Sequence, residues 1–166
     1  ALGEDDEGDE LGRVGAVRHG DADHGHVLPL VCETRGQHAQ TVKARAGRDF
    51  PVWCRIDSLE YRTEGGICLA DAAATAILAE AAGADAIHVS AYANPSSGAA
   101  FTEAPLVHRP GGYLSFAATI KAGLRIPVIA VGRIEPEIAE GVLRRGDADF
   151  IAMGRKLLAD PELPNK

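Results

Sequence analysis

Apolar and polar positions divide the chain near residue 47. Residues 1–46 are rich in Gly, Asp, Glu, His and Arg and carry few periodic apolar positions, so we expect an irregular, solvated segment there. From residue 47 onward, short apolar runs alternate with stretches of helical periodicity. The predicted organisation is therefore an irregular segment over 1–46 followed by a regular α/β domain over 47–166.

Strands and helices are predicted in strict alternation within that domain. The predicted strands occupy 51–56, 86–90, 126–131 and 150–153, and the predicted helices 71–82, 113–122, 136–145 and 156–159. Gly83 and Gly146 follow two of the helices where a left-handed residue is favoured, and Pro136 suits a first helical turn. Thr41 to Ala46 has the pattern of a helix end. The strands are continuously apolar, which predicts a parallel sheet covered by helices.

A weak internal repeat accompanies this pattern. Ala84-Asp85-Ala86-Ile87 is echoed by Ala148-Asp149-Phe150-Ile151, and Phe50-Pro51-Val52 by Ile126-Pro127-Val128. Repeated βα units suit either a (β/α)8 barrel or an open doubly wound sheet. A complete barrel needs about 250 residues, so a chain of 166 residues is too short to close one alone.

Charge and cysteine content narrow the function. The net charge of −7 argues against a nucleic-acid partner, which requires a basic surface. No apolar stretch approaches the ~20 residues of a membrane span, and no leader sequence is visible. Cys32, Cys54 and Cys68 lack paired metal spacing and are expected to be reduced thiols. We therefore expect a cytoplasmic protein that acts on a small molecule, without a membrane partner.

Two Gly-Arg pairs stand directly after predicted strands and before predicted helices. They are Gly132-Arg133 and Gly154-Arg155. Glycine lets backbone N–H groups approach a phosphate closely, a helix start adds unpaired donors, and arginine adds a permanent cation. Because the two strands are consecutive, their loops should be neighbours, and we expect them to bind a phosphate. The plainer alternative is that both glycines are only turn residues.

Other polar residues carry less specific signals. Arg55, at the end of its predicted strand, is either a ligand contact or part of a surface ion pair. His88 lies in an apolar strand and is more typical of a satisfied core histidine than of a ligand contact, with Ser90 and Tyr92 following it. The long loop from Ala93 to Gly112 has the length of a substrate-covering loop. Its polar residues, to which no role is assigned, include Glu103, His108, Arg109 and, just beyond it, Tyr113.

A metal site is not expected. His19, His24 and His26, with Asp21 and Asp23 between them, do not have the spacing of a common zinc module. A polar tail is the simpler interpretation of these residues. Cys54 and Cys68 are expected to be packing thiols, and Glu64-Gly65-Gly66 to form a turn.

The carboxyl-terminal motifs carry a family resemblance. They are Ile126-Pro127-Val128-Ile129-Ala130-Val131-Gly132-Arg133-Ile134 with Pro136, Gly146-Asp147-Ala148-Asp149-Phe150-Ile151-Ala152-Met153-Gly154-Arg155, and Leu158-Ala159-Asp160-Pro161-Glu162-Leu163. Together they resemble the Old Yellow Enzyme family, in its NADH:flavin oxidoreductase and 2,4-dienoyl-CoA reductase branch. Phe50-Pro51-Val52 through Arg55, with Glu64-Gly65-Gly66, resembles the family's fifth strand and following loop. The resemblance covers about residues 43 to 166, and its Gly-Arg-x-Leu-Leu-Ala-Asp-Pro ending is quite specific.

The resemblance implies strands 5 to 8 of a (β/α)8 TIM barrel that holds FMN at the carboxyl ends of its strands. Gly132, Arg133, Gly154 and Arg155 would contact the FMN phosphate. Arg55 would lie against the pyrimidine side of the flavin, where a cation stabilises the negative charge of the reduced ring. The implied activity is an NAD(P)H:flavin oxidoreductase that passes hydride through FMN to an activated alkene or related acceptor.

The resemblance also implies that part of the active site is missing. A complete relative carries four more βα units before Phe50, and residues 1 to about 42 do not resemble the fourth of them. One hypothesis is an out-of-frame start, which an intact coding frame through residue 42 would exclude. We expect little catalysis from this chain alone.

The sequence leaves alternatives open for both the assembly and the function. Bare sheet edges predict that the chain forms a homo-oligomer or pairs with a complementing half barrel. The rivals to the flavin enzyme are another phosphate-binding barrel enzyme and a truncated, non-catalytic chain.

Overall fold

The computed structural model describes residues 38–93 and 109–166. The histidines and acidic run of the amino-terminal segment, Cys32, and Glu103 and His108 of the long loop lie outside the described residues. Residues 38–46 are helical, which confirms the expected helix end at Thr41 to Ala46. The division of the chain into domains at residue 46 stays a prediction.

Four strands form a single parallel sheet whose order follows the sequence. They are β1 (Trp53–Tyr61), β2 (Ala86–Ala93), β3 (Val128–Ala130) and β4 (Phe150–Ile151). Every strand pairs with the next strand in the chain, so each connection crosses over through a helix in the same sense. The parallel α/β fold predicted from the alternation of strands and helices is confirmed.

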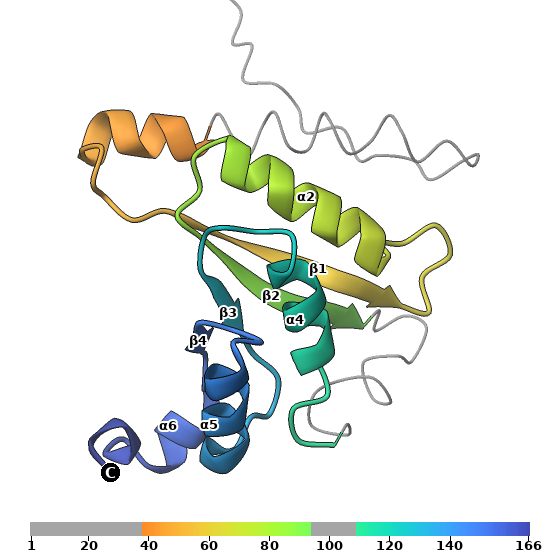
Figure 1. Ribbon diagram of the computed structural model, residues 1–166, viewed down its shortest axis with the longest axis vertical. Coiled ribbons are helices and arrows are strands. Elements are labelled where there is room, and N and C mark those ends of the chain that lie inside the picture. Colours follow the sequence, from red (N-terminus) through yellow and green to blue (C-terminus); the bar gives the residue numbers. More distant parts are fainter. Residues whose placement is uncertain (1–37, 94–108) are drawn as a thin grey trace, which may run out of the picture.

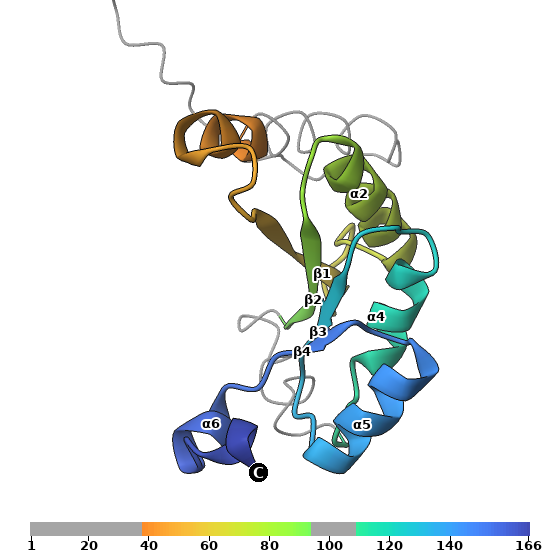
Figure 2. The ribbon, with the colours of Figure 1, turned by 60° about the vertical axis from the view of Figure 1, so that its left-hand side comes forward.

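Helices cover one face of this sheet. Figures 1 and 2 show α2 (Leu69–Ala81), α4 (Leu114–Lys121) and α5 (Pro136–Arg145) on the same side of the strands. The short α6 (Arg155–Ala159) and the 3-10 turn Leu163–Asn165 follow β4. No helix within the described ranges combines the length and the apolar character that crossing a bilayer requires.

The two faces of the sheet have different environments. Ile56, Val89 and Ala130 point toward the helices and are at most 4% exposed. The in-register row that alternates with them lies on the opposite face, which we call the open face; it comprises Arg55, His88, Ile129 and Phe150. Trp53 and Phe150 on that face are 57% and 58% exposed. Among the described residues the core therefore sits between the sheet and one helical layer.

The internal repeat has a structural role that the sequence pattern did not reveal. Asp149 accepts a hydrogen bond from the Val128 backbone N–H at 2.8 Å and an ion pair from Lys121 at 2.5 Å. Asp85 likewise accepts a hydrogen bond from the Val52 backbone N–H at 2.7 Å and forms an ion pair with Lys43 at 2.6 Å. Each aspartate ties the start of its own strand to the start of the preceding strand and to the helix before that. We call these two arrangements the aspartate clasps.

The strand boundaries depart from the predicted ones. β1 continues to Tyr61, although its pairing register with β2 shifts between Asp57 and Glu60. Arg55 is therefore the third residue of a nine-residue strand and not its last. The polar pair Asp57 and Ser58 interrupts the apolar pattern within β1, and Ser58 donates its hydroxyl to the Ser90 carbonyl at 2.6 Å.

Candidate functional site

The two Gly-Arg loops line one cavity at the carboxyl end of the sheet. The cavity has a volume of about 540 Å³, and Gly132, Arg133, Gly154 and Arg155 all border it. The other lining residues come from the same two loops and from α6: Val131, Ile134, Glu135, Ala152, Lys156 and Ala159. The structure therefore brings together the four residues that the sequence suggested for phosphate binding.

Gly132 is fixed in place by its conformation and by its neighbour. Its φ of +119° is one that residues with a side chain rarely adopt. A Cβ atom at this position would lie 2.9 Å from Cδ2 of Tyr113, whose ring is only 3% exposed. Tyr113 in turn stacks against Phe116 with ring centroids 6.0 Å apart. The first loop thus passes directly over a buried aromatic side chain.

The first loop is also strained at Arg133. This residue has a φ of +50°, and its carbonyl accepts the Gly111 N–H at 2.9 Å. That hydrogen bond ties the loop after β3 to the turn that leads into α4. Strained non-glycine residues persist only where their surroundings hold them, and they gather at ligand sites.

Gly154 has a different environment from Gly132. Its φ is −94°, and a Cβ atom built on it would meet nothing within 4 Å. It precedes α6, whose first residue, Arg155, is exposed beside the cavity. The open space above Gly154 leaves room for a ligand group to approach the backbone, and the first turn of α6 offers N–H groups without helical partners.

An ion pair joins the two loops at the rim of the cavity. Lys156 of α6 pairs with Glu135, which precedes α5. The hydrogen bond that Lys156 donates to Glu135, together with the negative charge of Glu135, raises the pKa of Lys156 above its ordinary value. The sequence analysis did not single out this pair. The sequence does contain a sign of this pair, because Glu135 and Lys156 carry opposite charges and lie just beyond the two Gly-Arg motifs.

Arg55 lies outside that cavity, on the open face of the sheet. Its Nη2 donates to Oγ of Ser90 at 2.8 Å, and Ser90 is only 3% exposed. The side chain therefore leans from β1 onto β2 instead of pairing with an acidic residue on the surface. The hydrogen bond holds a cation in a defined position on the open face.

His88 stands beside Arg55 in the sheet register. Burial lowers the pKa of His88, and the positive charge of Arg55 lowers it further, so the imidazole is neutral at pH 7. Its Nε2 atom is buried and has no hydrogen-bond partner. The expected core histidine with satisfied hydrogen bonds is therefore wrong, since one ring nitrogen has none.

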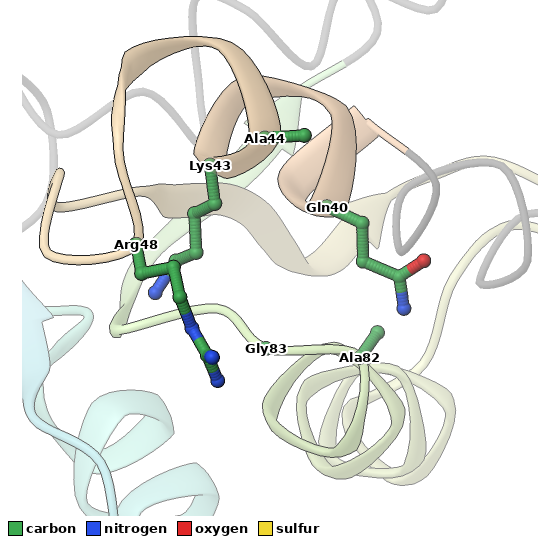
Figure 3. A pocket seen from close by; sticks show the side chains of 6 residues that line it. All are labelled: Gln40, Lys43, Ala44, Arg48, Ala82 and Gly83. Atoms are coloured by element: carbon green, nitrogen blue, oxygen red, sulfur yellow. The ribbon is translucent and has the colours of Figure 1, made fainter.

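A second hollow lies at the opposite end of the strands. Figure 3 shows Gln40, Lys43 and Arg48 above the end of α2 at Ala82 and Gly83, around a space of about 330 Å³. Lys43 there is already paired with Asp85. The carboxyl end of a helix carries partial negative charge, which does not favour an anion. Lys43 and Arg48 therefore line a hollow whose neighbouring helix end opposes an anion, unlike the helix start beside the first cavity.

Comparison with known proteins places these features in a family context. The model of the NADH:flavin oxidoreductase / NADH oxidase family matches residues 38–166. A NADH oxidase of Thermoanaerobacter brockii is 40% identical over 126 residues, which cover 75% of this chain and 19% of the relative. An NADPH dehydrogenase of Bacillus pumilus is 37% identical over 117 residues, covering 70% of this chain and 32% of the relative. The chain spans less than a third of the length of either relative.

A solved structure shares the fold. The histamine dehydrogenase of Rhizobium sp. 4-9 superposes with a TM-score of 0.63 and 23% sequence identity, over 77% of this chain and 18% of the other. At that identity the similarity concerns the parallel α/β fold.

Proposed function

Because the chain belongs to the NADH:flavin oxidoreductase / NADH oxidase family, we propose that it supplies the FMN-binding half of a flavin oxidoreductase. In this proposal the parallel sheet is the carboxyl-terminal half of a (β/α)8 barrel. The whole enzyme takes hydride from NADH or NADPH and passes it to an activated alkene or related acceptor. FMN, when bound, supplies the hydride chemistry, and the protein supplies position and charge.

The observation that carries this proposal is the convergence of two Gly-Arg loops on one cavity. A phosphate monoester needs several N–H donors and a compensating cation. Gly154 leaves the backbone accessible, and Gly132, Arg133 and Arg155 border the same space. In (β/α)8 barrels the loops after strands 7 and 8 are the frequent phosphate site, and β3 and β4 correspond to those strands in the proposed half barrel.

The open face fits a flat, polar ring system. Arg55 is held by Ser90 with its charge on that face, where it would stabilise negative charge on the pyrimidine side of a reduced flavin. The unpartnered Nε2 of His88 lies on the same face, in register with Arg55. Together they provide a fixed cation and a neutral imidazole on the side of the sheet that no helix of residues 38–93 and 109–166 covers.

The non-catalytic alternative keeps one observation in its favour. The chain covers 19% of one relative and 32% of another, so most of the residues of those enzymes have no counterpart here. We accordingly propose that this chain alone binds the cofactor phosphate and does not turn over substrate. FMN binding without reductase activity is the pattern that this combination produces.

The test is an FMN titration of the purified chain and of Arg155→Ala, followed by quenching of flavin fluorescence. We expect the dissociation constant to rise about tenfold or more in Arg155→Ala, because a charge-assisted hydrogen bond is worth about 1.5–3 kcal/mol. Arg144→Ala is the matched control. Arg144 lies at the far end of α5, is exposed, and pairs with Glu140. Equal FMN affinity in both variants would contradict the proposal.

A further inference from the structure

We propose that a second copy of this chain covers the open face, with β4 of each copy pairing in parallel with β1 of the other. Two chains would then close one eight-stranded barrel about a two-fold axis. The proposal concerns assembly and does not depend on the identity of the cofactor. It rests on the two edges of the sheet, on the internal repeat and on the pairing register.

Among the described residues, the two edge strands carry large exposed apolar side chains. Trp53 of β1 and Phe150 of β4 are more than half exposed, and Phe50, just before β1, is 50% exposed. Both strands also end the sheet, so each has one row of backbone groups that no described strand pairs with. Exposed aromatic side chains beside an unpaired strand edge mark a surface built to be covered.

The internal repeat shows what the missing junction should resemble. Trp53 pairs with Ala86 in the β1–β2 junction, and Ile129 pairs with Phe150 in the β3–β4 junction. These two pairs occupy the same places relative to the aspartate clasps, since Val52 corresponds to Val128 and Asp85 to Asp149. The β1–β2 and β3–β4 junctions therefore have the same pairing register relative to their aspartate clasps.

The β2–β3 junction joins these two pairs of strands and supplies a template. There Ile87 pairs with Val128 and Val89 with Ala130. Transferred by the repeat, the β4–β1 junction pairs Ile151 with Val52 of the second copy. One residue further on, Ala152 faces Trp53 of the second copy, which sets a small side chain beside a large one.

The register across the sheet has the value needed for closure. Following paired residues from Arg55 leads to His88, then Ile129, then Phe150. The template places Phe150 opposite Pro51 of the second copy. Crossing the four strands of one copy therefore shifts the pairing register by about four residues along β1. Crossing the eight strands of two copies shifts it by about eight residues, which is the shear number of a closed (β/α)8 barrel. Two copies therefore have both the strand number and the stagger of a complete barrel.

The experiment traps this junction with a disulfide. The template pairs Met153 with Cys54 of the second copy, and both side chains pack toward the helical layer. Neighbouring strands lie about 4.8 Å apart, within the range of a disulfide. Within one chain β1 and β4 are separated by β2 and β3, about 14 Å in all, so that bond is possible only between copies.

The variant is Met153→Cys in a background with Cys32→Ser and Cys68→Ser, which leaves Cys54 as the other thiol. Mild oxidation should give a covalent dimer on a non-reducing gel. Ala152→Cys in the same background is the control, because its side chain points to the opposite face and should crosslink far less. Sedimentation of the wild-type chain at about 10–50 μM should give the mass of a dimer.

Three results would overturn the proposal. A wild-type monomer at these concentrations would leave the open face without a second copy. A dimer that crosslinks equally through residues 152 and 153, or through neither, would have another interface. A chain that stays monomeric but binds a separately produced amino-terminal half barrel of a relative would show that a different occupant covers the face.

Discussion

Two glycines at the cavity have opposite structural demands, although the sequence motifs around them look alike. Gly132→Ala should destabilise the chain by about 2 kcal/mol or more, because a left-handed residue would gain a Cβ atom 2.9 Å from the Tyr113 ring. Gly154→Ala should change the free energy of unfolding by less than about 0.5 kcal/mol, because its Cβ meets only open space. Urea denaturation of both variants measures the difference, and equal losses would contradict this account.

Asp149 makes stability depend on pH. Burial raises its pKa, but the hydrogen bonds from Lys121 and from the Val128 N–H outweigh that effect and lower the pKa below 3.8. A depressed carboxyl pKa contributes stability above the unfolded value, which is lost as pH falls through the folded pKa.

Asp149→Asn should therefore lower the free energy of unfolding in urea at pH 7, by about 1 kcal/mol at most since the ion pair is partly exposed, and this loss should shrink as pH falls below 3.8. Asp147→Asn is the control, because Asp147 pairs only with the exposed Arg145. A difference in unfolding free energy between Asp149→Asn and wild type that does not shrink as pH falls below 3.8 would be the contrary result.

His88 should titrate below its ordinary value of 6.5. Burial is the larger cause, and the charge of Arg55 adds to it. Arg55→Gln should move the midpoint upward, toward 6.5. Imidazole resonances followed by NMR between pH 4 and pH 8, with His88→Gln for assignment, give both midpoints. An unchanged midpoint in Arg55→Gln would show that the charge of Arg55 does not reach the ring.

The residue types in the sequence suggested where a ligand site could lie, but not which side chains contact one another. Both Gly-Arg pairs stood out in the sequence because each directly follows a predicted buried strand and precedes a predicted helix. The partner of Arg55 was not, since Ser90 is 35 positions away and a serine has no distinctive pattern. Asp85 and Asp149 were visible as a repeat, yet their role depends on Lys43 and Lys121, which lie on helices outside the repeated motifs.

At the scale of elements, α2 is anchored through its last turn. Glu80 accepts the backbone N–H groups of Arg125 and Ile126 at 2.9 and 3.1 Å, just before β3. Glu80→Ala should cost about 1–3 kcal/mol, because two donors lose their shared acceptor, and Glu80→Gln should recover at least half of that loss. Thermal or urea unfolding distinguishes the variants. Equal losses would show that charge, and not the acceptor, matters.

Helix ends were more predictable than strand ends. α5 runs from Pro136 to Arg145 as the sequence predicted, since proline suits the first turn and Gly146 adopts φ +74° after the last. β3 spans only Val128–Ala130 and β4 only Phe150–Ile151, although their apolar runs are longer. Strand length depends on how far the neighbouring strand continues, which a local apolar pattern does not contain.

At the scale of the whole molecule, the two ends of the sheet carry different structural features. The aspartate clasps hold the amino ends of the strands, and the Gly-Arg loops meet at the carboxyl ends. The parallel fold followed from the alternation of strands and helices. The open face did not, because the apolar strands predict burial on both sides, whereas helices of the described residues cover only one side. Whatever covers that face, the proposed phosphate site after β3 and β4 lies at the carboxyl end of the sheet.

The most direct measurement compares FMN with riboflavin, which lacks the phosphate, in fluorescence titrations of the wild-type chain. If the two Gly-Arg loops hold a phosphate, FMN should bind at least about tenfold more tightly, a difference of about 1.4 kcal/mol. The advantage should shrink as salt rises, since part of it is electrostatic. Equal affinity for the two flavins, or no saturable binding of FMN, would contradict the account.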